Sequence, residues 1–223
     1  MSVQGLDCIG ITDAEFTPNN VQTSRRTNAG GSQVLTTGLG FWTAKLRIET
    51  PTRQAFSVWD SWATARQASR YPFLLGRTFR NTPRGGAVTD SSLTLTSVNA
   101  AAGTITLGGA GTYTARMGDM ISYKTAAGGY WLGTVLQNVV AGGGSLTLPV
   151  WPMPLPANVT PKPRRMSAFG EFTISRVRKS ETFEPNYFEF EAEQVNRTPS
   201  DEPSPLIAPN QGESLAYAET LEL

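Results

Sequence analysis

The sequence predicts a mainly β protein with one helix. Three observations carry this prediction. The 223 residues include 22 Gly and 15 Pro, short runs of alternating apolar and polar residues recur, and one stretch has helical spacing. The length suits one large or two small domains.

No apolar run approaches the roughly 18 residues of a membrane-spanning helix. The N-terminus lacks a charged and then apolar signal region, so we expect a soluble chain made in the cytoplasm.

The first 40 residues have weak periodicity. Ile9 and Ile11 alternate with small or polar residues and predict a first strand. The Thr-Pro-Asn-Asn run at 17–20 is typical of a turn. We therefore expect this strand to be short and to end before residue 17.

Residues 24–31 are polar, end in two glycines and predict a loop. The loop carries two adjacent arginines, Arg25 and Arg26. They are candidates for contact with an acidic partner, and the alternative is an ordinary solvated loop.

The most regular stretch follows. Residues 41–49 alternate strictly, which predicts a strand with one buried face. Residues 53–69 change to helical spacing, and Pro72 then ends the helix before a short buried strand at 73–75. The residues at steps of three and four are Phe56, Trp59, Trp62, Ala63 and Arg66. Because this stretch has no catalytic pattern, we interpret it as the core of the scaffold.

A second unit of short strands is expected over residues 87–157. The strands are predicted at 93–96, 104–107, 117–123, 130–136 and 145–148. The first two are predicted to form a hairpin, and the third and fourth to form another strand pair. Pro149 and three later prolines are predicted to end any further strand. Proline and glycine residues at 82–86 and the prolines from Pro149 onward bound this segment, which we therefore interpret as a small β domain.

Two longer strands, at 166–177 and 187–195, predict a closing hairpin. The first strand and the two residues directly after it carry the basic residues Arg176, Arg178 and Lys179. The second places Glu189, Glu191 and Glu193 on one face and Phe188, Phe190 and Ala192 on the other. Opposed unlike charges stabilise a strand pair by roughly 0.2–1 kcal/mol each. The Glu stripe is predicted to be solvated or to face a partner.

Residues 196–223 carry four prolines and predict an extended, acidic C-terminal arm. The apolar pair Leu206 and Ile207 inside this arm suggests docking on a neighbour. Net charge also differs along the chain: +5 for residues 1–157, +5 for 158–180 and −9 for 181–223, within a total of +1. Such asymmetry suits complementary surfaces, and the near-zero total argues against a general nucleic-acid binder.

The chain has no His and one Cys, Cys8. A Ser-His-Asp or Cys-His arrangement, a Cys/His zinc site and an internal disulfide are therefore excluded within the chain. We expect no cofactor, no metal and no enzymatic activity, and a carboxylate-pair enzyme such as a glycosidase is the weakest alternative. Asp119 follows Gly118 and is predicted to be a turn residue rather than an acid or metal ligand.

Trp131 and Trp151 are the candidates for a sugar-binding surface in the second unit. Their alternative role is buried or half-buried packing. The second hypothesis for function, a carbohydrate-binding accessory module, depends on these two rings.

The order of these features resembles a known family. A strand, a Trp-bearing helix and a return strand are followed by an inserted β domain with Gly118-Asp119, a Trp131-Leu132-Gly133 strand, a Gly-rich turn and Pro149, and paired strands close the chain. Over roughly residues 30–195 this resembles the minor tail proteins of tailed bacteriophages, above all the distal tail protein.

The resemblance implies a β-sandwich (split-barrel-like) domain with one helix, formed by residues 1–86 and 158–195, plus an inserted small β-barrel-like domain at 87–157. It also implies a ring of copies, usually six, that joins the tail tube protein to the tail hub protein in the virion. No catalytic residues carry over. The expected function is therefore structural, with the basic strand and the acidic stripe meeting between subunits.

Overall fold

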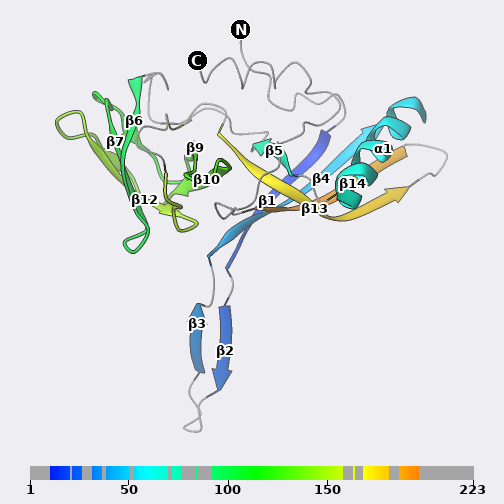
Figure 1. Ribbon diagram of the computed structural model, residues 1–223, viewed down its shortest axis with the longest axis horizontal. Coiled ribbons are helices and arrows are strands. Elements are labelled where there is room, and N and C mark those ends of the chain that lie inside the picture. Colours follow the sequence, from blue (N-terminus) through cyan, green and yellow to red (C-terminus); the bar gives the residue numbers. More distant parts are fainter. Residues whose placement is uncertain are drawn as a thin grey trace.

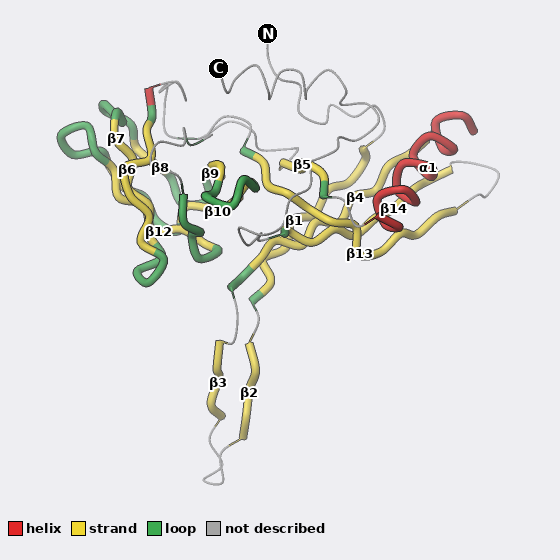
Figure 2. Tube along the Cα trace, viewed as in Figure 1, coloured by secondary structure: helices red, strands yellow, loops and turns green. Residues whose placement is uncertain are grey.

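The computed structural model describes residues 11–20, 22–26, 32–36, 39–50, 53–69, 72–76, 84, 92–157, 163, 168–180 and 186–195. It confirms a mainly β fold with one helix, in which curled antiparallel sheets form a half-barrel (Figures 1 and 2). Figure 1 shows two β units side by side, of which one carries the helix. A hairpin projects from the unit that carries the helix.

The main sheet has five antiparallel strands in the order β1-β4-β14-β13-β5. Their bounds are β1 (Ile11–Asn19), β4 (Phe41–Thr50), β5 (Phe73–Gly76), β13 (Phe169–Ser180) and β14 (Asn186–Gln194). Since β13 and β14 lie between β4 and β5, the two ends of the described chain form one sheet.

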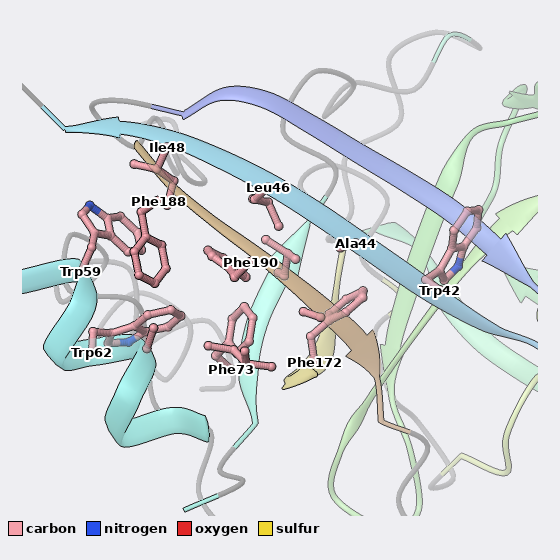
Figure 3. Packing of buried hydrophobic residues seen from close by; sticks show 14 of the residues in the cluster. Trp42, Ala44, Leu46, Ile48, Trp59, Trp62, Phe73, Phe172, Phe188 and Phe190 are labelled. Carbon is pink, nitrogen blue, oxygen red and sulfur yellow. The ribbon is translucent and has the colours of Figure 1, made fainter. Parts of the chain in front are cut away.

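The helix α1 (Arg53–Ser69) lies over the apolar face of this sheet (Figure 3). All five residues of the predicted stripe are buried, so the strand, helix, strand prediction for residues 41–76 is confirmed. Trp62 makes edge contacts with Trp59 and Phe73 at centroid distances of 5.5 and 5.2 Å. Burial lowers the pKa of the Arg66 guanidinium, whose Cζ lies 5.7 Å from the Trp62 ring centroid. This aromatic layer fixes the helix on the sheet.

The second unit is a five-stranded antiparallel sheet in the order β6-β7-β12-β10-β9, with a small additional pair, β8 and β11. The strands are β6 (Thr94–Asn99), β7 (Thr104–Gly108), β8 (Thr114–Ala115), β9 (Met120–Lys124), β10 (Tyr130–Val135), β11 (Val139–Val140) and β12 (Leu146–Trp151). The predicted β6–β7 and β9–β10 hairpins are confirmed. A separate apolar core around Trp131 holds this unit together.

The prediction that Pro149 ends its strand was wrong, because β12 continues to Trp151. The carbonyl of Pro149 accepts a hydrogen bond from Leu136 N at 2.9 Å, and Val150 N donates to Gly103 O at 2.9 Å. The backbone hydrogen bonds of β12 therefore continue past Pro149, although the nitrogen of this proline has no hydrogen to donate.

Two predictions in the first 40 residues were also wrong. β1 runs through the expected turn at 17–20 as far as Asn19, since Pro18 is tolerated in an edge strand. The expected loop at 24–31 begins inside a strand: β2 (Gln22–Arg26) pairs with β3 (Ser32–Thr36). Together they form the hairpin that projects away from the main sheet (Figure 1).

Candidate interaction surface

The face of the main sheet opposite α1 carries two rows of alternating charge, which we name the charged face. The first row crosses β1, β4, β14 and β13 as Glu15, Lys45, Glu191 and Arg176. The second row crosses the same strands as Asp13, Arg47, Glu189 and Arg178. Each row reads acid, base, acid, base, so unlike charges are neighbours at every step.

Glu189 is a largely covered acid of the charged face, with 13% of its side chain exposed. Its Oε1 lies 3.5 Å from Lys45 Nζ and 3.7 Å from Arg178 Nη1. Arg47 lies over the Tyr187 ring, with Cζ 4.4 Å from the centroid. The predicted opposition of a basic β13 and an acidic β14 is therefore present, and it is made within one chain.

The other two predicted charges lie apart from these rows. Lys179 is opposite Phe188 and forms an ion pair with Asp60 of α1, on the helix side of the sheet. Glu193 is exposed and lies between Thr43 and Thr173 in the strand register. A bulge between Ile174 and Arg176 reverses the alternation of β13. Arg176 and Arg178 therefore lie on the charged face, and Val177 and Lys179 lie on the helix side.

Both lateral ends of the charged face are open strand edges in the described part of the chain. β1 is the first strand of the sheet, so its outer backbone groups pair with no described strand. β5 covers residues 169–172 of β13, and residues 174–180 pair with β14 alone among the described strands. At the β1 edge both rows end in an acid, Glu15 or Asp13. At the β13 edge both rows end in a base, Arg176 or Arg178.

Arg25 and Arg26 lie in β2, opposite Gln33 and Ser32 of β3. They belong to the hairpin that projects away from the main sheet (Figure 1). Leu206 and Ile207 lie outside the described residues.

The two candidate sugar-binding rings are packed rather than displayed. Trp131 is 0% exposed, lies 4.9 Å from the Tyr123 ring centroid and donates from Nε1 to Met153 O at 3.2 Å. Trp151 is half-buried against Trp42, with centroids 4.9 Å apart. The placement of Trp131 leaves no ring face for a sugar, so that interpretation fails for this residue.

Asp119 is a buried hydrogen-bond acceptor at the start of β9. It accepts from Arg84 N at 3.2 Å, Tyr113 Oη at 3.2 Å and Arg116 N at 2.9 Å. Gly118 before it has φ +86°, which confirms the predicted turn. Within the described residues, no three Asp, Glu, Cys or His side chains group as a metal site would require. No described helix is both long and apolar enough to cross a membrane.

Sequence reasoning missed the β1 and β4 members of the charged face. The strict alternation of residues 41–49 already placed Lys45 and Arg47 on the wet side of a strand. Asp13 and Glu15 were not assigned to a strand face, because the turn predicted around Pro18 gave no sign that β1 extends to Asn19. Only the strand order places Lys45 and Arg47 next to β14, and Asp13 and Glu15 one strand further out.

No protein-family model matches this chain, and no curated protein is significantly similar to it.

Proposed function

We propose that the chain is a structural component of a bacteriophage tail tip. In this proposal, copies of the chain form a closed ring of six that joins the tail tube to the tail hub. The chain performs no catalysis, binds no nucleic acid and is made in the host cytoplasm before it enters the virion. The observation that carries the proposal is the pair of open sheet edges with opposite charge.

The strand directions support edge-to-edge assembly. Successive strands from β1 through β4 and β14 to β13 are antiparallel, so β1 and β13 run in opposite directions. If a second copy keeps the same orientation, its β1 is antiparallel to β13 of the first copy. The hydrogen-bond pattern of the sheet then continues from copy to copy.

The charges support the same direction of assembly. A junction between the two edges places Glu15 and Asp13 of one copy beside Arg176 and Arg178 of the next. The rows then continue as acid, base, acid, base without a like-charge contact. Such a head-to-tail contact joins two different surfaces and closes into a ring when the rotation per copy permits it.

This arrangement changes the expected pairing between subunits. Glu189 already has Lys45 and Arg178 as partners within its own chain. The acids at the sheet edge are those of β1, which the sequence analysis did not include.

The first test is the mass distribution of the purified chain by mass photometry at low and high salt. The proposal expects a closed oligomer at low salt that dissociates as ionic strength rises, because exposed charges are screened. A chain that is monomeric at every micromolar concentration and salt condition would count against the ring.

A charge exchange gives the sharper test. Glu15→Arg and Arg176→Glu each place like charges at the proposed junction, and each variant alone is expected to lose the oligomer. An equimolar mixture of the two variants restores unlike charges at every junction and is expected to recover it. Glu193→Arg, at an exposed site away from both edges, is the matched control and should assemble normally. If the β1 and β13 edges do not meet in the oligomer, mixing the two variants should not restore it.

A further inference from the structure

The root of the projecting hairpin is held by a residue of the second unit. Asn20 directly follows β1, Gly40 directly precedes β4, and the adjacent pair Asn19 and Phe41 face each other in the register. Trp151, the last residue of β12, contacts this root from the other sheet. We name Trp151, Asn20, Gly40 and Trp42 the root joint.

The root joint has three well-defined contacts. Trp151 Nε1 donates to Asn20 Oδ1 at 2.9 Å, and its ring meets Trp42 edge to face at 86°. A Cβ at Gly40 would lie 2.7 Å from Trp151 Cζ2, which is closer than real Cβ contacts allow. Residue 40 must therefore be glycine for the indole to lie against the backbone at this distance.

The hairpin needs such support. Each of its strands pairs only with the other among the described strands, and a two-stranded hairpin alone is marginally stable in water. It follows β1 and precedes β4 in the chain, so its link to the rest of the molecule runs through the ends of these two strands. If only the main sheet contacted these strand ends, the hairpin could rotate relative to the second unit.

We propose that Trp151 couples the projecting hairpin to the second β unit, so that the two move as one body. Displacement of the hairpin by a binding partner would then be passed through the indole to β12, which lies in the middle of the second sheet. This inference concerns a single chain, so it stands or falls independently of ring assembly.

Spin-label distance measurements on the full chain test the coupling. The native Cys8 is replaced by Ser, and labels are attached at cysteines introduced by Ser24→Cys in β2 and Ala101→Cys in the exposed β6–β7 loop. The distance distribution is expected to be narrow in this parent. Adding Trp151→Ala is expected to broaden it at least about twofold, because the hydrogen bond and the ring contact are both lost.

Two further variants separate the coupling from general damage. Trp151→Phe keeps a ring but removes the N–H donor, so an intermediate width is expected. Met153→Ala removes a nearby exposed side chain outside the root joint and should leave the distribution unchanged. The proposal is overturned if the parent distribution is already broad, or if it stays narrow in both Trp151 variants. If Trp151→Ala fails to fold, the comparison of Trp151→Phe with Met153→Ala decides.

Discussion

Asp119 holds together three parts of the second unit through one carboxylate. Its donors come from Arg84 in the connection that leads into the unit, from Tyr113 before β8, and from Arg116 after β8. The side chain of Asp119 is only 3% exposed, whereas that of Arg84 is 53% exposed. The carboxylate is therefore chiefly a hydrogen-bond acceptor for buried groups, and the ion pair with Arg84 is a smaller contribution.

We predict that Asp119→Ala lowers the free energy of unfolding by about 2–4 kcal/mol, because several donors lose their acceptor in a buried place. Urea unfolding of the isolated chain measures this loss. Glu193→Ala, at an exposed position of β14 between threonines, is the control and should change stability by less than about 0.5 kcal/mol. Equal effects of the two substitutions would contradict a structural role for Asp119.

Tyr123 gives a pH-dependent prediction. Burial raises the pKa of its phenol above the ordinary value of 10.0, and Oη donates to Leu155 O at 2.6 Å. An unfolded tyrosine ionises near pH 10 while the folded one stays protonated, so its contribution is complete below pH 10 and is lost above it. Tyr123→Phe should cost about 1 kcal/mol at pH 7. That difference should shrink by about 1.4 kcal/mol per pH unit above pH 10. Paired urea titrations from pH 7 to 11 check the convergence, and a constant difference would refute it.

Among the elements, β14 shows the consequence of alternation most clearly. One face of this strand carries Phe188 and Phe190 into the aromatic layer, and the other carries Glu189 and Glu191 into the charged face. The strand is therefore stabilised on one side by apolar burial and on the other by neighbouring bases.

The two ends of the Glu stripe should differ in stability. Glu189 lies between two bases, so Glu189→Gln is expected to destabilise the chain by about 1 kcal/mol. Glu193 lies between threonines, and Glu193→Gln should be neutral within about 0.5 kcal/mol. Urea unfolding at 0.05 and 1 M salt measures both, and the Glu189 effect should decrease at high salt. A salt-independent loss would indicate packing rather than charge.

At the scale of the whole molecule, Gln194 joins the two β units. Its Oε1 accepts from Trp42 N at 3.2 Å, and its Nε2 donates to Leu132 O at 3.2 Å. Met120 and Leu132 of the second unit are also part of the apolar core of the first. The amide therefore satisfies one backbone group from each unit at a buried junction.

We predict that Gln194→Ala lowers the free energy of unfolding by about 2 kcal/mol, because both backbone groups lose their partner. It should also separate the calorimetric transition of the chain into two, since the units lose part of their common boundary. Gln137→Ala, at an exposed site in the second unit, is the matched control. A single transition with unchanged midpoint would show that the shared apolar core alone unites the units.

The sequence by itself determined the alternation of β4 and β14, the buried stripe of α1 and the hairpins of the second unit, because these depend on neighbours along the chain. It could not determine the length of β1 or the passage of β12 through Pro149, since the effect of a proline depends on whether a partner strand needs its amide. Strand order, decided only by tertiary packing, placed Asp13 and Glu15 at one open edge and Arg176 and Arg178 at the other. The interaction surface comes from that order, because Lys45 and Glu191, 146 positions apart, become adjacent only when β14 lies between β4 and β13.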